Sequence, residues 1–196
     1  MLKLSRKRIL GVEPHILIME YAGKFNDYKS VIEKIAGSSS ADNINNKADK
    51  NKTDASDSNE SEITLKGIDA VSPLVFGQTM IRSASGLSGA VVRGVEPASG
   101  VSIIKGFTAQ ELEEKLGEDR DDSPFPGIIM GRQLAKHVGV NVGDKVVLMA
   151  PGGTLSPVGH MPSMTRFVVT GLFDSGMYEY DSSLAYINLK DAQRLM

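Results

Sequence analysis

One polar segment decides how this chain can fold, because it separates the parts that can form a hydrophobic core. Residues 38–62 consist mainly of Ser, Asn, Asp, Lys and Glu and contain a single large apolar residue, Ile44. Such a segment cannot bury enough apolar surface to offset the entropy lost on ordering it, so we predict a disordered insertion. Loop-closure entropy grows only logarithmically with length, so a domain tolerates such an insertion. The core must come from residues 1–37 and 63–196.

The residues before the insertion contain two apolar patterns. Pro14 to Tyr21 is a short apolar run with branched side chains, which predicts a buried strand. Asn26-Asp27 then offers a helix N-cap, and Gly37 offers a helix end. Between them, apolar residues recur at the i, i+3, i+4, i+7 spacing of an amphipathic helix. These residues are Tyr28, Val31, Ile32 and Ile35.

The residues after the insertion alternate short apolar runs with helical patterns, which predicts an α+β fold. Thr108 and Glu111 have the spacing of a capping box at a helix start, and Gly143-Asp144 is a turn signal. The acidic stretch 118–122 is expected to be a solvated loop. The expected strands are residues 68–76, 89–95, 127–131, 145–149, 166–173 and 184–189, and the expected helices are residues 108–116, 132–138 and one from Asp191 to the last residue, Met196.

Charge and composition limit the kinds of partner that the chain can bind. Its 22 Lys and Arg nearly balance its 24 Asp and Glu, giving a net charge of −2. This balance excludes a generally basic surface, so we expect no nucleic-acid partner. No stretch approaches the roughly 20 apolar residues that cross a bilayer. The chain contains no cysteine, which excludes disulfides, thiol chemistry and thiolate metal sites.

The residues that could support catalysis are scattered. His15, His137 and His160 fall in different predicted elements, and none has the spacing of a metal site. Glu179 and Asp181 would share one face if their segment were extended, and paired carboxylates can do acid–base work. No His, Lys or Arg stands beside them, so solvated edge residues are favoured over a hydrolase site. We therefore expect no enzymatic activity, no metal and no cofactor.

One loop has an unusual composition. Met149 to Thr165 holds 17 residues without Lys, Arg, Asp or Glu, but with three Pro, three Gly and three Met. Both flanks are predicted strands, so the segment is expected to be a long hairpin loop. Proline keeps it from extending the sheet, and methionine often lines adaptable binding surfaces. Composition leaves two interpretations equally open, a binding loop or a loop folded back over its own core.

Several segments together resemble a known family. They are Arg8 to Ile16, Val92 to Pro97, Gly143 to Val146 and Gly171 to Asp181, with the closing Asp191 to Leu195. In this order they resemble the extracytoplasmic domain of lipoprotein-releasing permeases of the LolC/LolE type, within the wider MacB-like class of ABC transporter permeases. The resemblance covers nearly all of the chain outside the insertion.

This resemblance implies a non-enzymatic domain on the periplasmic side of the inner membrane, between the first and second of four transmembrane helices. A porter-like βαβ part would begin with residues 1–97, and an inserted, smaller β-rich part, called Sabre-like, would comprise residues 98–196. The family's second porter half would lie beyond this chain. A second permease subunit and cytoplasmic ATPase subunits would complete a complex that releases lipoproteins.

The resemblance also implies how the uncharged loop is used. In the family, a proline-tipped hairpin called the hook holds a LolA-type lipoprotein carrier, and Pro157 is the expected tip here. The family also has a basic pad near the return strand of this hairpin, and Arg166 is its candidate here. Arg166 is displaced by one position along the strand, so we expect its side chain on the opposite face of that strand from the family's pad residue. The alternative is a MacB-like export or efflux permease that contacts an adaptor protein. The expected hook residues are Leu155, Pro157, Val158, Gly159, His160, Met161 and Pro162.

Overall fold

The computed structural model divides the chain into two compact units. One unit comprises residues 1–18 and 72–196, and the other comprises residues 19–71; each is considered by itself. The residues that the structure describes are 16–19, 27–39, 71–101, 103–104, 106–117, 123–151, 155–156 and 159–196.

The smaller unit contains one described helix, and the larger unit contains all the described strands. The elements are α2 (Tyr28–Ser39), β1 (Leu74–Arg82), β2 (Leu87–Val95), α3 (Pro97–Gly100), α4 (Ala109–Leu116), β3 (Gly127–Gly131), α5 (Arg132–Val138), β4 (Lys145–Ala150), β5 (Leu155–Ser156), β6 (Gly159–His160), β7 (Ser163–Phe173), α6 (Tyr178–Ser183), β8 (Leu184–Asn188) and α7 (Leu189–Leu195).

Six of the strands close into a barrel in the order β1-β2-β8-β3-β7-β4. The β2–β8 and β3–β7 pairs are parallel, and the other pairs are antiparallel. The barrel closes where β1 meets β4, with Met80 opposite Met149 and Arg82 opposite Val147. Strands from both sides of the expected boundary at residue 97 thus share one barrel. Its assignment as Sabre-like stays a prediction.

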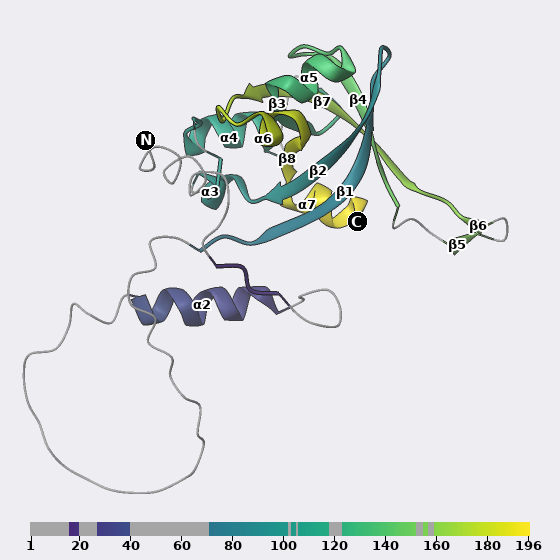
Figure 1. Ribbon diagram of the computed structural model, residues 1–196. Coiled ribbons are helices and arrows are strands. Elements are labelled where there is room, and N and C mark those ends of the chain that lie inside the picture. The colour runs from purple at the N-terminus through teal and green to yellow at the C-terminus, as the bar shows by residue number, and fades with distance from the viewer. Residues whose placement is uncertain are drawn as a thin grey trace, which may run out of the picture. The chain divides into compact units, whose positions relative to one another are not determined.

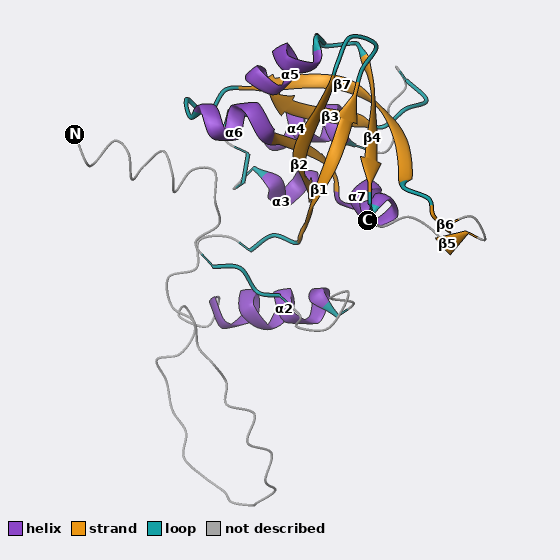
Figure 2. Cartoon of the chain, turned by 45° about the vertical axis from the view of Figure 1, so that its right-hand side comes forward, coloured by secondary structure: helices purple, strands orange, loops and turns teal. Residues whose placement is uncertain are grey.

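Two hydrophobic cores hold this unit together. The first fills the barrel and includes Ile81, Leu148 and Phe167, with residues of α5 and α7. Figures 1 and 2 show α5 and α7 at opposite ends of the barrel. The second core lies outside the barrel, where Leu112 and Leu116 of α4 pack with outward residues of β3 and β8. Helices therefore cover one side of the barrel exterior.

Two glycines make this packing possible. Gly94 lies in β2 against α7, and a Cβ added there would meet the Ala192 Cβ at 2.2 Å. Any larger residue at this position would push the helix off the strand. Gly139 follows α5 with φ of 67°, in the left-handed region that glycine adopts without strain. It therefore ends the helix and turns the chain towards β4.

Elements with their own end signals form as predicted. β3 and α5 have the predicted bounds, and α4 begins with the predicted capping box between Thr108 and Glu111. The helix expected to end at Gly37 continues to Ser39, so the first two residues of the predicted insertion are helical. The rest of that insertion and the acidic stretch 118–122 lie outside the described residues.

Two strand predictions are wrong. Residues 16–19 of the predicted strand 14–21 form no regular element, and Ile16 is 75% exposed. An apolar run becomes a buried strand only where a neighbouring strand pairs with it. The strand predicted at 68–76 starts at Leu74 and continues to Arg82, because the whole segment pairs with β2.

Other boundaries differ by a few residues. β7 begins at Ser163 rather than residue 166, since its first residues pair with β4. The Asn188 side chain accepts a hydrogen bond from the Lys190 N–H at 2.9 Å, so α7 begins at Leu189, two residues earlier than predicted.

The described elements together form a mixed fold of helices and strands. Within its described part, none of the helices is long and apolar enough to span a membrane.

Candidate docking surface

The connection between β4 and β7 leaves the barrel as an arm, which we define as residues 151–162. The paired ends of β4 and β7 bring both ends of the arm together. Within it, β5 and β6 form a two-stranded antiparallel ribbon in which Leu155 pairs with His160. Figures 1 and 2 show this ribbon standing away from the barrel. The arm is three residues shorter on its return side than the predicted loop, because residues 163–165 belong to β7.

The arm contains all the residues expected to form a hook. Pro157 and Val158, including the expected tip, lie outside the described residues. Met161 is 58% exposed and Pro162 is also exposed, immediately before β7. Neither side chain contributes to the barrel core. The structure describes only the backbone of the other three, which are Leu155, Gly159 and His160.

Three methionines lie in register at the base of the arm, and we call them the methionine row. Met80 of β1 pairs with Met149 of β4, which pairs with Met164 of β7. Met80 is 47% exposed, Met164 is 60% exposed, and Met149 between them is half-buried. Their chain neighbours Ile81 and Leu148 point into the barrel and are fully buried. Because side chains alternate along a strand, the methionine row lies on the outer face.

A second row runs beside the first, and we call it the basic row. Arg82 of β1 pairs with Val147 of β4, which pairs with Arg166 of β7. Both arginines are exposed, and neither forms an ion pair with a residue that the structure describes. Arg166, the candidate pad residue, therefore lies on the same outer face as Met164. None of the six barrel strands contains Asp or Glu.

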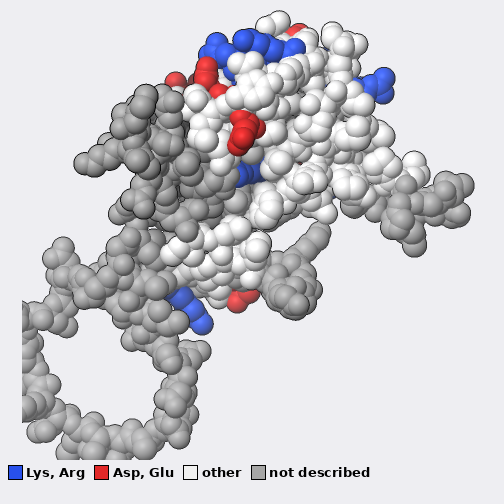
Figure 3. Space-filling model, in the orientation of Figure 1, with Lys and Arg blue, Asp and Glu red and all other residues white. Residues whose placement is uncertain are grey.

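Sequence reasoning missed the contribution of β1 to this surface. The prediction ended the strand near residue 76, because Gly77 and the polar residues after it break the apolar run. The missed signal is a weak alternation, in which Thr79 and Ile81 are buried while Met80 and Arg82 are exposed. In Figure 3, charged side chains gather over α5 and α6, whereas the side towards the arm is largely uncharged.

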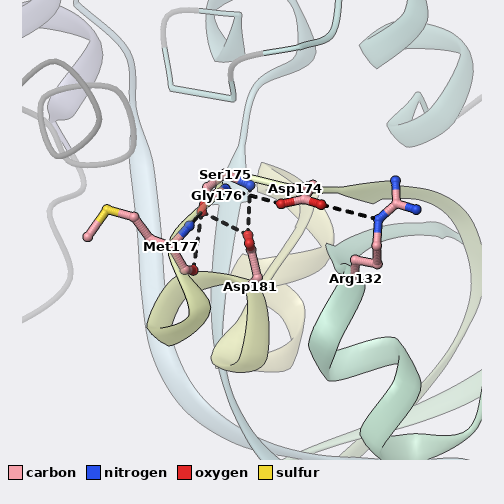
Figure 4. Close-up of polar contacts among 6 residues, drawn as sticks. All are labelled: Arg132, Asp174, Ser175, Gly176, Met177 and Asp181. Carbon is pink, nitrogen blue, oxygen red and sulfur yellow. Dashed lines mark hydrogen bonds and ion pairs between the residues drawn. The ribbon is translucent and has the colours of Figure 1, made fainter. Parts of the chain in front are cut away.

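The two candidate carboxylates do not form a pair. Their segment was expected to be extended, but it forms α6, so Glu179 is exposed while Asp181 is 4% exposed. One oxygen of Asp181 accepts hydrogen bonds from the backbone N–H and the hydroxyl of Ser175, both at 2.8 Å (Figure 4). These bonds hold the turn between β7 and α6. Asp181 therefore has a structural role in this turn.

A neighbouring aspartate stabilises the same turn from its outer side. Asp174 accepts a hydrogen bond from the Gly176 N–H at 3.1 Å, and its second oxygen lies 3.5 Å from Nε of Arg132 (Figure 4). Arg132 is the first residue of α5. The ion pair therefore links α5 to the turn before α6, and the side chains drawn in Figure 4 form a structural network rather than a catalytic one.

Of the three histidines, His137 is the one whose side chain the structure describes. His137 lies in the last turn of α5, as predicted, and its Nε2 is 3.4 Å from the Tyr178 hydroxyl. The two rings meet edge to face, with centroids 6.3 Å apart. His15 lies outside the described residues. In the part of the chain that the structure describes, no group of three or more His, Cys, Asp or Glu is arranged to hold a metal ion.

Comparison with known proteins gives a family match over most of the chain. Residues 26–196 match the model of the MacB-like periplasmic core domain. The chain is 34% identical over 133 residues to the lipoprotein-releasing system transmembrane protein LolC of Neisseria meningitidis serogroup B, covering 66% of this chain and 31% of that protein. It is 38% identical over 110 residues to LolC of Xylella fastidiosa, covering 55% of this chain and 25% of that protein.

The chain therefore spans a third or less of the length of these curated relatives. Among solved structures, the extracellular domain of the noncanonic ABC-type transporter YknZ from Gram-positive bacteria is similar with a TM-score of 0.39 and 13% sequence identity. That match covers 66% of this chain and 59% of the YknZ chain.

Proposed function

The chain belongs to the family of MacB-like periplasmic core domains, and from this premise we propose that it docks a periplasmic lipoprotein carrier for an ABC transporter permease. The chain is similar to proteins named as lipoprotein-releasing system transmembrane proteins, and this similarity supports lipoproteins as the transported molecules. In this proposal the domain faces the periplasm at the inner membrane. It works with a second permease subunit, and separate cytoplasmic subunits hydrolyse ATP.

The uncharged arm, which is exposed at its described residues Met161 and Pro162, is the observation that carries this proposal. Met161 and Met164 are exposed where the arm joins β7, although inward side chains of the same barrel such as Phe167 and Leu148 are fully buried. Exposed apolar surface gains free energy only when a partner removes it from water, at roughly 25 cal/mol per Å² before the costs of association. The arm prolines restrict the free chain and so reduce the entropy lost on docking. Such a projecting element suits protein binding.

The proposed roles of the residues follow from their positions. Leu155, Pro157, Val158 and Met161 provide the main apolar contact with a carrier of the LolA type. The smaller or polar residues beside them, Gly159, His160 and Pro162, shape the hook, and Arg166 provides a basic contact on β7. A few such residues usually dominate the energy of an interface. The barrel that carries the arm corresponds in this proposal to the Sabre-like part of the family's domain.

Titration of the chain with the LolA-type carrier tests the proposal. We expect deletion of residues 154–162, or the double change Pro157→Asp with Val158→Asp, to abolish binding. Val142→Asp is the matched control, because Val142 is 59% exposed but lies before β4, at the end opposite the arm. Circular dichroism should show the same fold for all variants. If the deletion variant binds as tightly as the wild type, the docking role is wrong.

A further inference from the structure

We propose that the docking surface extends from the arm onto the outer face of β1, where Met80 and Arg82 take part in binding. The partner surface that fits this face is an apolar patch of a protein bordered by carboxylates. This inference deepens the proposed carrier docking and rests on it. The surface then comprises the arm, the methionine row and the basic row.

The methionine row forms one continuous apolar strip. Directly opposite side chains on neighbouring antiparallel strands have Cβ atoms about 5 Å apart. Met80, Met149 and Met164 therefore span about 10 Å across three strands. Unbranched thioether side chains adapt to the shape of an apolar partner. The strip ends on β7 three residues after Met161, so it continues the exposed apolar surface of the arm.

The three methionines are not part of the barrel core. Its interior is filled by the residues that alternate with them, such as Ile81, Leu148 and Phe167, all 0% exposed. On the other side of the barrel, the outward residues Ile129 and Tyr186 are covered by the second core. No such core covers the base of the arm, where the outward side chains of Met80 and Met164 are 47% and 60% exposed. Contiguous exposed apolar surface commonly marks an interaction site.

The charge of the face identifies the chemistry of the partner. Arg82 and Arg166 flank the half-buried Val147, and both are free of ion pairs within the described part of the chain. Lys145, also outward on β4, has its Nζ 5.0 Å from the centroid of the Phe125 ring, so the aromatic ring already engages it. The few charged side chains of this face are all basic, although the whole chain has a net charge of −2. Complementary carboxylates on the partner would steer and orient docking.

Charge reversal at one arginine, matched by an equal change elsewhere, tests the inference. In titrations of the full chain with the LolA-type carrier, we expect Arg82→Glu to raise Kd at least tenfold and to reduce its dependence on salt. We expect Met80→Ser to raise Kd severalfold. Lys136→Glu changes the net charge equally, but Lys136 is an exposed residue of α5 and not of the outer face of β1, β4 or β7, so its Kd should stay within twofold of the wild type.

The outcomes separate this inference from the docking role itself. If arm deletion abolishes binding while Arg82→Glu and Met80→Ser leave Kd unchanged, the β1 contribution is wrong and the hook proposal stands. If arm deletion has no effect, the docking role fails. A parallel titration uses vesicles of phosphatidylglycerol and phosphatidylethanolamine. Loss of vesicle binding by Arg82→Glu, without any change in carrier Kd, would assign the face to lipid and overturn the inference.

Discussion

The start of α4 shows how two residues stabilise a helix end and make it depend on pH. The Thr108 hydroxyl accepts a hydrogen bond from the Glu111 N–H at 3.2 Å. The Glu111 carboxylate accepts bonds from the Thr108 N–H at 2.7 Å and from its hydroxyl at 3.0 Å. The backbone bond, and then the hydroxyl bond, lower the pKa of Glu111 below its ordinary value. The ionised form is therefore favoured in the folded state.

A pH series on Glu111→Gln tests this effect. A carboxyl group whose folded pKa is lowered stabilises the fold above its unfolded pKa, about 4.3 for Glu. That contribution is lost as the pH falls through the folded pKa. Glutamine can keep the capping hydrogen bonds but has no charge. We expect the variant to have a lower Tm than the wild type at pH 7 and the same Tm at pH 3. An equal Tm difference at both pH values would contradict the prediction.

At the scale of elements, α6 depends on one buried carboxylate. The carboxylate of Asp181 is buried and accepts hydrogen bonds from both the backbone N–H and the hydroxyl of Ser175, whereas Glu179, two residues earlier, is exposed to solvent. Gly131 permits the close approach of this helix, since a Cβ added there would lie 2.2 Å from the Asp181 carbonyl oxygen. The turn, the helix and the end of β3 are thus fixed together.

Matched alanine variants distinguish the two carboxylates of α6. We expect Asp181→Ala to lower the free energy of unfolding by about 2 kcal/mol, because two hydrogen bonds to a buried charged acceptor are lost. Glu179→Ala should change it by less than about 0.5 kcal/mol, as is usual for exposed positions. Urea unfolding at neutral pH measures both values. Equal effects of the two variants would show that the network in Figure 4 does not stabilise the fold.

Elements were predictable from the sequence where their signals are local. The Gly-bounded strand β3, the helix α5 ended by Gly139 and the capping box of α4 are all defined by nearby residues. α6 was missed because its short polar sequence has no apolar periodicity, and its N-cap Met177 makes no side-chain capping bond. β1 was misplaced because its pairing with β2 and β4, rather than its own pattern, fixes its extent.

The candidate site was predictable only in part for the same reason. The uncharged composition of residues 149–165 identified the arm without any structure. Composition did not show that Met164 belongs to a row with Met80, some 80 residues earlier, because cross-strand register depends on barrel closure. Arg82 was missed as a partner of Arg166 on the surface for the same reason. A surface assembled from three strands becomes visible only when the sheet is closed.

At the scale of the whole molecule, barrel closure makes the larger unit self-contained. Among the described residues, every barrel strand lies between Leu74 and Asn188, and both cores lie between Leu74 and Met196. Pairing of β1 with β4 leaves the barrel without a free edge strand, which removes a site for non-native strand pairing. The arm and both surface rows also belong to this unit. Folding and docking are therefore expected to reside in the same part of the chain.

This organisation predicts that residues 72–196 fold without the rest of the chain. We expect this fragment to unfold in one cooperative transition with a Tm within about 5 °C of the full chain, since a change of 1 kcal/mol in stability shifts Tm by roughly 2–8 °C in domains from 60 to 250 residues. It should also bind the carrier with unchanged Kd, because the arm, the methionine row and the basic row are retained. Calorimetry and titration measure the two properties separately. A broad unfolding transition or a much lower Tm would show that residues 1–71 complete the core. A cooperative transition at the expected Tm together with a raised Kd for the carrier would place part of the docking surface in residues 1–71.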